Sequence, residues 1–337
     1  MVAGSLAATG VRASLQGLYT LLPPSGQLAL LNTTTGAATP VGQPLTAYGW
    51  VPSVDCSPSA IDTTGKWMYV LARNNTGDGP LAVVSLELAD GSIRAANTLP
   101  DRLPATLSPC DIAFAADGTW HVYLAAAVGD SLVAYAYAFA PPYQEGFALV
   151  ADVPTADLAL GTPLPVPAAA VTYSTLWVAL SDGLAGFSLG AAPTNATNVN
   201  GTLRSLPISS ATPVAGLGFD HKSDNVTAVL LLTPAGDGAT LSSFVDVGAG
   251  TPTLTPAGTG SGAGTPPLPP PTSPAAFALL TDKAALALLT SNNSVLVIAA
   301  ATNGSLLSTA AVCSSPSLRS DAPSSCPLTL SYEHFVF

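Results

Sequence analysis

The stretch SAIDTTGKWMYVLA (residues 59–72) decides the fold, because it joins two apolar segments through a polar turn. Val, Ile, Tyr and Trp favour strands, whereas Asp, Thr and Gly favour turns, so the stretch is typical of a β-hairpin. The same pattern recurs along the chain, in residues 111–125, 169–180, 215–232, 275–289 and 328–337. Recurrence at a spacing of roughly fifty residues predicts a repeat architecture.

Each repeat continues beyond this hairpin, whose two segments we name strand A and strand B. A turn rich in Asn, Asp and Gly follows strand B, as in NNTGDG (74–79), and leads into a third strand, C. A fourth strand, D, begins after a glycine turn, as in GSIRAANTL (91–99). Four strands joined by short hairpins predict an antiparallel meander.

This four-stranded unit resembles a blade of the β-propeller superfamily, and the resemblance implies an all-β ring. Strand A occurs six times and ends at the C-terminus, whereas the B–C hairpin occurs six times and begins in GLYTLLPPSGQLALLNTT (17–34). This offset predicts a single domain (1–337) of six blades, closed by pairing of the N- and C-terminal segments. Seven blades are the alternative, because GSLAATG (4–10) resembles a strand D and HFVF (334–337) a strand B.

Seven of the eleven asparagines begin the N-x-[ST] signal for N-glycosylation, and each falls at a predicted turn or strand end. We predict glycans at Asn32, Asn74, Asn195, Asn200, Asn225, Asn292 and Asn303. In a propeller blade, the A–B and C–D turns share one face and the B–C and D–A connections share the other. The sequons then divide five to the first face and two, Asn74 and Asn292, to the second.

The four cysteines suggest two disulfides, since an even number is usual in secreted chains. Three pairings are possible. We favour Cys313–Cys326, which closes a short Ser/Pro-rich loop, and Cys56–Cys110, since both of these cysteines precede a strand A on neighbouring blades. No C-x-x-C occurs, which argues against a zinc site.

Residues 258–274 (GTGSGAGTPPLPPPTSP) form a Gly/Ser- and Pro-rich segment, which predicts a long surface loop within the domain. Its Pro/Ser/Thr cluster is similar to hydroxyproline-rich cell-wall glycoproteins of green algae, and a plain spacer loop is the alternative. The resemblance implies hydroxylation and O-glycosylation of Pro266, Pro267, Pro269, Pro270, Pro271 and Pro274.

Charge excludes some classes of partner. The chain carries 20 acidic and 9 basic residues, a formal net charge of −11, so nucleic-acid binding is not expected. Only 9% of its residues are charged, and attached glycan would be another source of solubility. Apolar runs such as VAYAYAFA (133–140) fall far short of the roughly 18 residues that span a bilayer, so no membrane span is expected.

Candidate chemical groups are few. Asp55, Asp62 and Asp111 could line a central channel, and Asp220, His221 and Asp224 share a predicted turn without the spacing of a calcium loop. We expect His121 and His334 to pack in the core. Trp67, Trp120 and Trp177 occupy equivalent positions in the predicted B strands. No motif of a hydrolase, metalloprotease or nucleotide-binding enzyme occurs, so we expect no catalytic, metal or cofactor site.

These features together predict an extracellular, heavily glycosylated structural or adhesive protein. Its expected partners are copies of itself or other extracellular glycoproteins, in a wall, sheath or surface filament. Residues 1–17 lack the apolar run of a signal peptide, so the extracellular location rests on the sequons and cysteines. The alternatives are an extracellular propeller hydrolase or lyase with a metal in its channel, and a lectin-like carbohydrate-binding module.

Overall fold

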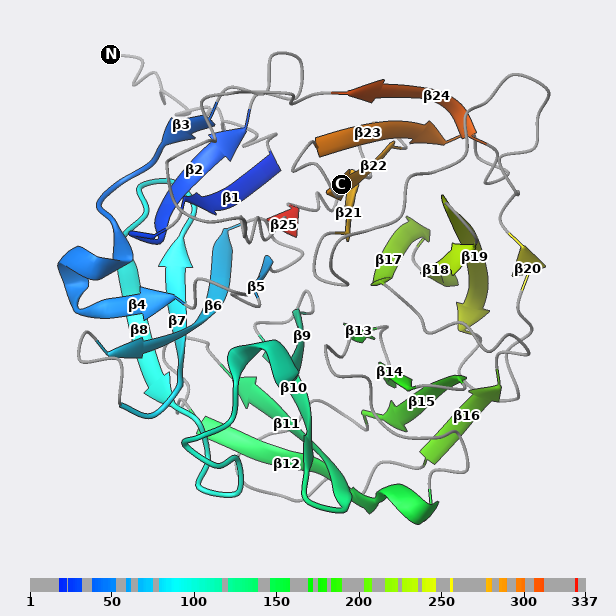
Figure 1. Cartoon of the computed structure of the whole chain (residues 1–337), viewed down its shortest axis with the longest axis horizontal. Coiled ribbons are helices and arrows are strands. Elements are labelled where there is room, and N and C mark those ends of the chain that lie inside the picture. The colour runs from blue at the N-terminus through cyan, green and yellow to red at the C-terminus, as the bar shows by residue number, and fades with distance from the viewer. Residues whose placement is uncertain are drawn as a thin grey trace, which may run out of the picture.

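The structure is a computed structural model of the whole chain. It describes residues 18–22, 24–31, 38–52, 59–61, 66–74, 79–116, 121–138, 146–157, 169–171, 175–180 and 183–189. Backbone elements alone are described at 203–207, 216–223, 226–235, 238–246, 255–256, 277–280, 285–289, 295–300, 306–311 and 331–332. The described part is all-β with antiparallel sheets, which confirms the predicted fold class at that level (Figure 1).

Apart from β25, the strands of three sheets come from the first half of the chain. The first sheet has the order β25-β1-β2-β3, and its strands are β1 (Leu18–Leu22), β2 (Gln27–Leu31), β3 (Ala38–Pro40) and β25 (Ser331–Tyr332). The second contains β4 (Trp50–Pro52), β5 (Ser59–Ile61), β6 (Trp67–Asn74), β7 (Ala82–Glu87) and β8 (Ile93–Thr98). The third contains β9 (Ile112–Ala116), β10 (His121–Val128), β11 (Ser131–Ala138) and β12 (Gly146–Pro154).

The later sheets repeat this meander. The fourth is formed by β13 (Ala169–Val171), β14 (Thr175–Leu180), β15 (Gly183–Ser188) and β16 (Leu203–Pro207). The fifth is formed by β17 (Gly216–Ser223), β18 (Val226–Ala235), β19 (Gly238–Asp246) and β20 (Thr255–Pro256). The sixth is formed by β21 (Phe277–Leu280), β22 (Ala285–Leu289), β23 (Val295–Ala300) and β24 (Leu306–Ala311).

The first strands of successive sheets lie nearest the centre of the view in Figure 1. There β5 contacts β9, β9 contacts β13, β13 contacts β17 and β17 contacts β21. β21 then contacts β25, and β25 contacts β5, so the contacts between inner strands return to their starting point. The C-terminal strand β25 pairs antiparallel with β1, near the other end of the chain.

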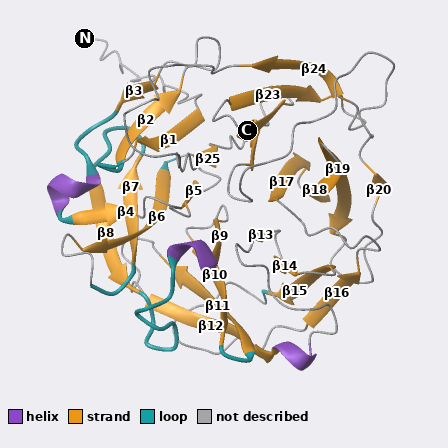
Figure 2. Ribbon diagram, viewed as in Figure 1, coloured by secondary structure: helices purple, strands orange, loops and turns teal. Residues whose placement is uncertain are grey.

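Three short 3₁₀ turns are the only helical elements among the described residues (Figure 2). They are η1 (Leu45–Tyr48), η2 (Pro109–Asp111) and η3 (Thr155–Asp157), and each follows the outer strand of a sheet. Within the part of the chain that the structure describes, no helix has the length and apolar character needed to cross a membrane.

Burial explains why the strands differ in sequence pattern. In β6, the six residues from Trp67 to Ala72 are all buried, because neighbouring sheets cover both of its faces. Its sequence is therefore a continuous apolar run. In the outer strand β8, half-buried and exposed residues alternate, so Ile93 and Ala95 share one face with Asn97. The strand position within a sheet thus decides whether the apolar residues are consecutive or alternate.

One strand of the second sheet was not predicted. β5 begins at Ser59, where we expected strand A, but β4 also pairs with β6, in the register Trp50↔Asn74 to Pro52↔Ala72. β5 continues along the same edge, from Ser59↔Val70 to Ile61↔Met68. β6 is eight residues long, so its last residues need a partner beyond β5, and the Trp-Val-Pro segment supplies it.

A repeated aromatic position fixes the packing between sheets. In four sheets, the second residue of strand B that pairs with strand A is aromatic and is at most 2% exposed. These residues are Tyr19, Tyr69, Tyr123 and Trp177. Opposite three of them on strand C stand small residues, in the pairs Tyr69↔Ser85, Tyr123↔Ala136 and Trp177↔Gly186. The largest ring faces the smallest partner, as close packing requires.

Candidate functional site

Six of the seven sequons lie in connections between strands, and the seventh ends a strand. In chain order, Asn32 follows β2, Asn195 and Asn200 separate β15 from β16, Asn225 separates β17 from β18, Asn292 separates β22 from β23 and Asn303 separates β23 from β24. Asn74 is the last residue of β6. Five of the seven therefore belong to A–B or C–D connections and two to B–C connections. The structure describes only Asn74 among these residues.

Asn74 is held closely by its surroundings. It is half-buried, pairs with Trp50 of β4, and its side-chain amide lies against Gly79, where even an added Cβ atom would overlap it. The neighbouring Arg73 guanidinium donates to the carbonyl oxygen of Gly79 at 2.8 Å, which holds the two ends of the B–C connection together. The side of Asn74 that faces Gly79 is therefore unavailable to a glycan.

Arg73 also fixes the D–A connection that follows β8. Its Nη1 donates to the carbonyl oxygen of Ala105 at 2.9 Å, and its Nη2 donates to that of Leu107 at 2.8 Å. Hydrogen bonds from a charged donor contribute more than neutral ones. Leu107 in turn packs against the apolar cluster between the second and third sheets. One side chain thus joins two connections on the same face as Asn74.

Replacing Arg73 by methionine is expected to lower the free energy of unfolding by about 2–4 kcal/mol, because three carbonyls lose a charged donor. Amide hydrogen exchange at residues 103–107 should become faster, since Leu107 and Ala105 lose their attachment. The matched control is Arg94→Met, which removes an exposed arginine that bonds no carbonyl in the described residues. Equal effects of the two variants would contradict this role for Arg73.

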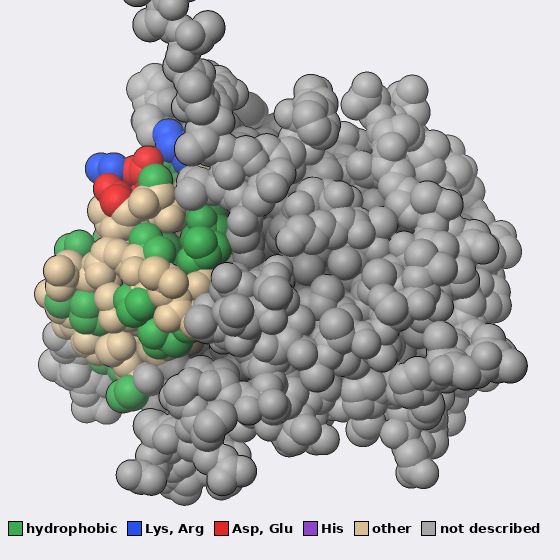
Figure 3. All heavy atoms as spheres, turned by 90° about the horizontal axis from the view of Figure 1, so that it is seen from above, with side chains coloured by type: hydrophobic (Ala, Val, Ile, Leu, Met, Phe, Trp, Pro, Cys, Tyr) green, Lys and Arg blue, Asp and Glu red, His purple; other side chains and the backbone are tan. Residues whose placement is uncertain are grey.

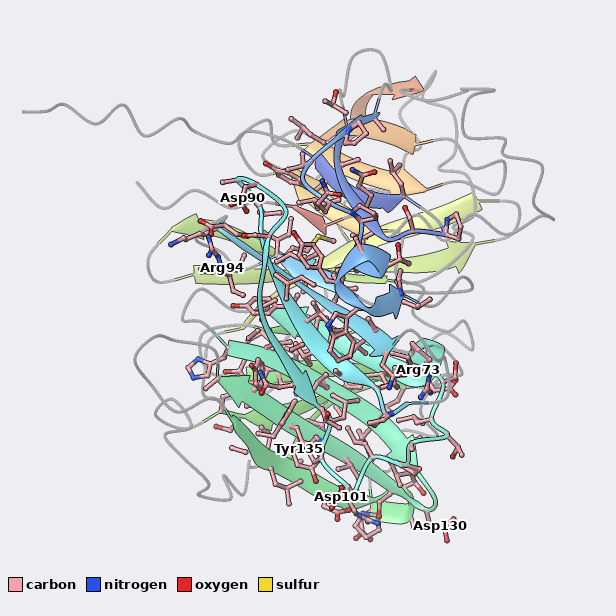
Figure 4. All side chains as sticks on the ribbon, turned by 90° about the vertical axis from the view of Figure 1, so that its left-hand side faces the viewer. Arg73, Asp90, Arg94, Asp101, Asp130 and Tyr135 are labelled. Atoms are coloured by element: carbon pink, nitrogen blue, oxygen red, sulfur yellow. The ribbon has the colours of Figure 1, made fainter. Side chains whose placement is uncertain are left out.

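A different polar group occupies the turn between β7 and β8. Arg94 forms a salt bridge with Glu87, and the backbone N–H of Ser92 donates to Asp90 Oδ1 at 2.8 Å. Hydrogen bonding from Ser92, together with the charge of Arg94, holds the pKa of Asp90 below its usual value. Figure 4 shows Asp90 and Arg94 near one edge of the view and Arg73 near the other, so the two groups lie at opposite ends of the strands of this sheet.

The second and third sheets are also joined by polar contacts. The amide Nδ2 of Asn97 donates to the hydroxyl of Tyr137, which is fully buried. Arg102 and Asp152 form an exposed ion pair at 3.1 Å, close to Tyr135. Burial raises the pKa of the Tyr135 hydroxyl, so this group stays neutral at physiological pH. These contacts order the interface between sheets.

The predicted cysteine positions are only partly described. Cys110 lies in η2, directly before β9, as expected for a residue that precedes a strand A. Cys56, Cys313 and Cys326 lie outside the described residues, as do the six prolines of segment 258–274. In chain order, Cys56 falls between β4 and β5, shortly before the inner strand that begins at Ser59. Both disulfides remain predictions.

Only one of the three candidate channel groups, Asp111, belongs to the described residues. Asp111 is half-buried in η2, whereas Asp55, Asp62, Asp224 and His334 lie outside the described residues. No group of three His, Cys, Asp or Glu residues that could hold a metal occurs among the residues described. His121 is buried in β10 with its ring 6.3 Å from that of Tyr123, which agrees with a packing role.

Two sequence-based placements need correction. Asp220 and His221 belong to β17 and pair with Ala228 and Thr227 of β18, so they do not lie in a turn. Trp67 and Trp177 are not equivalent: Trp67 precedes the first pair between strands A and B, and Trp177 follows it. Both are buried, at 5% and 0% exposure, so they serve the core rather than a carbohydrate-binding surface. Trp120 lies outside the described residues.

The described surface is poor in charge. Figure 3 shows apolar and uncharged side chains over most of the coloured surface, with basic and acidic side chains next to one another at one corner. Among the described residues, Tyr48 is the only large apolar side chain that is well exposed, at 45%. Scattered exposure of this kind is ordinary for a protein surface and marks no binding patch.

Comparisons with known proteins add little. No known protein family matches the sequence, and no curated protein matches it significantly. Among solved structures, AofleA from Arthrobotrys oligospora is similar at 9% identity with a TM-score of 0.46, covering 88% of this chain and 85% of that one. Apo AztD from Citrobacter koseri is similar at 12% identity with a TM-score of 0.38, covering 95% and 99%.

A xylan β-1,4-xylosidase from a Bacillus species is similar at 11% identity with a TM-score of 0.35, covering 76% of this chain and 50% of that one. At TM-scores below 0.5 these likenesses assign neither activity nor ligand to this chain.

Proposed function

We propose that this protein is a secreted, glycosylated structural or adhesive protein, built on a six-bladed β-propeller that its two ends close. The circuit of contacts between inner strands and the pairing of β25 with β1 support the closed ring. A ring of sheets has few free edges, which suits a protein that is exposed outside the cell.

The observation that carries the glycoprotein assignment is the placement of the seven sequons. All of them fall at strand ends or between strands in chain order, which is where glycan acceptors are usually accessible. The alternative is that turns rich in Asn, Ser and Thr produce this three-residue signal by chance. Five of the seven lie in A–B or C–D connections. Glycan therefore covers mainly one face of the proposed ring, and the face with Arg73 and the D–A connections stays more open to contacts.

Secretion of the chain from a eukaryotic host should give a product whose intact mass falls on treatment with peptide-N-glycosidase. The enzyme converts each modified asparagine to aspartate, so peptide mass spectrometry then maps the occupied positions. Asn75 and Asn97, which begin no sequon, are internal controls. A mass that does not change would overturn the glycoprotein proposal.

The same mapping tests the local geometry of Asn74. We expect Asn74 to be the least occupied of the seven positions, because its amide lies against Gly79 and its backbone pairs with Trp50. Replacing Gly79 would overfill this contact, so the cleaner comparison is with Asn292, the other B–C sequon. Occupancy at Asn74 equal to that at Asn292 would contradict the expectation.

A further inference from the structure

Prolines end most of the outer strands. Strand D forms the outer end of each sheet, toward the rim of the view in Figure 1. Four of these six strands end on a proline, namely β3 on Pro40, β12 on Pro154, β16 on Pro207 and β20 on Pro256. Proline has no N–H to donate, so it protects a free edge from pairing with a strand of another chain.

Hydrogen bonds show which way two of these prolines face. Directly after Pro40 and Pro154, the backbone N–H groups of Val41 and Thr155 donate at 2.7 Å to carbonyl oxygens on or next to strand C. Backbone groups alternate in direction along an antiparallel strand, so both prolines face the free edge. A proline at this position therefore costs the sheet no hydrogen bond.

The outer strand β8 lacks this proline. Leu99, which follows its last residue, donates to the carbonyl oxygen of Leu81 at 2.9 Å, so Thr98 occupies the position that proline takes in β3 and β12. The backbone N–H and C=O of Thr98 therefore face the free edge, as do those of Ala96 two residues earlier. Within the described part of the chain, no backbone group bonds to this edge of either residue.

The open edge of β8 is short and has clear limits. At its start, a register shift between β7 and β8 leaves Arg94 as a bulge, which interrupts regular pairing. Beyond its end stands Pro100, which has no N–H to donate. Ala96 and Thr98 thus offer two N–H donors and two C=O acceptors between these limits.

We propose that the free edge of β8 pairs antiparallel with the same edge of a second copy, about a two-fold axis at Asn97. In this register, Ala96 of each copy lies opposite Thr98 of the other, so four hydrogen bonds use every donor and acceptor of the open edge. Antiparallel pairing also separates the two Arg94 side chains, whereas parallel pairing in register would place them side by side. The inference rests on the proposed function, to which it adds the contact between copies.

Two features suit this edge to contact between copies. The stretch 75–194, which contains β8, has no sequon, so the proposed glycans are attached elsewhere. Arg94 is the one charged residue of β8, and it forms a salt bridge with Glu87 of its own chain. Repulsion between two chains of net charge −11 opposes association, and salt screens that repulsion.

Sedimentation equilibrium of the full chain at high ionic strength, over a range of concentrations, tests the pairing. Thr98→Pro removes one N–H from each copy, and with it two of the four hydrogen bonds, so it should weaken dimerisation at least about thirtyfold. The fold should be kept, because β3 and β12 carry proline at the same position. Thr98→Ala is the matched control, since it keeps the N–H and should change dimerisation no more than about threefold.

A cross-link gives a second measurement that does not depend on the folding of the proline variant. When the Ala96→Cys and Thr98→Cys variants are mixed and mildly oxidised, position 96 of one chain should link to position 98 of the other. Each variant alone should link several-fold less, because its cysteines are offset by two residues across the pair. Mass spectrometry of the linked peptide separates it from links among the four native cysteines.

Three results would overturn the pairing: a monomer at every concentration, equal effects of Thr98→Pro and Thr98→Ala, or no preference for the mixed link. None of these results depends on glycan. A failure of this contact is therefore distinct from a failure of the glycoprotein assignment, which the intact mass of the secreted protein decides.

Discussion

Gly42→Ala is expected to lower the free energy of unfolding by about 2–5 kcal/mol. Gly42 has φ +65°, where an alanine is strained, and an added Cβ would overlap the carbonyl oxygen of Asp90 and lie 2.9 Å from the Cα of Gly91. Gly91 mirrors it, with φ +69° and an added Cβ 2.6 Å from the carbonyl oxygen of Val41. Strain and overlap therefore act together at this position.

The surroundings of Gly42 leave no easy relaxation. Val41 donates to the carbonyl oxygen of Leu28 at 2.7 Å, and Gln27 Nε2 donates to the carbonyl oxygen of Gly42 at 2.8 Å. The connection after β3 is thus fixed to β2 while it touches the turn between β7 and β8. The added methyl group would meet backbone atoms of that turn, so flexible side chains cannot absorb it.

Gly129→Ala is the matched control, because Gly129 has φ +57° and no atom within 4 Å of its added Cβ. It isolates the conformational cost of about 1–2 kcal/mol. Urea denaturation gives the loss of unfolding free energy for each variant, and the difference between the two losses is the contribution of the contact with the neighbouring sheet. If Gly42→Ala lowers the unfolding free energy no more than Gly129→Ala does, Gly42 does not lie against the backbone of the neighbouring sheet.

Gly186→Ala is expected to cost about 1–3 kcal/mol for a different reason, since its backbone is unstrained. The added Cβ would lie 2.7 Å from the ring of Trp177, which is fully buried. The equivalent pairs Tyr69↔Ser85 and Tyr123↔Ala136 show how the fold accommodates a larger partner, namely with a smaller ring.

The double variant Gly186→Ala/Trp177→Tyr should therefore recover part of the loss. It reproduces in the fourth sheet the pair that the third sheet already contains. Trp177→Tyr alone should be destabilising because it leaves a cavity, so the two single effects should add up to more than the double effect. Denaturation of all four proteins gives this coupling. Additive effects would show that the two residues do not compete for the same space.

The strand repeat could be predicted from the sequence because its signals are local. The turns NNTGDG, VGD and SDG sit directly between apolar runs, and the strands they join appear as β6 and β7, β10 and β11, and β14 and β15. The seven sequons, defined by three residues each, could likewise be placed without a structure. Their modification is a separate matter, which mass spectrometry of the secreted protein decides.

Register could not be predicted in the same way. Six residues (62–67) separate the paired residues Ile61 and Met68, but only four (172–175) separate Val171 and Leu176. Alignment on tryptophan therefore matched Trp67 with Trp177, whereas pairing matches Tyr69 with Trp177. β4 was missed for a related reason, because three residues carry too little pattern and its pairing depends on the length of β6.

The direction of the pairing between β25 and β1 has a mechanical consequence. Leu18 begins β1 and lies opposite Tyr332, the last residue of β25, so the chain segments beyond both residues leave from the same end of the pair. Tension between those two segments pulls the strands apart sideways and breaks their hydrogen bonds one after another. Such unzipping requires little force, so stretching an assembly of these chains by their ends would open this pair before any blade unfolds.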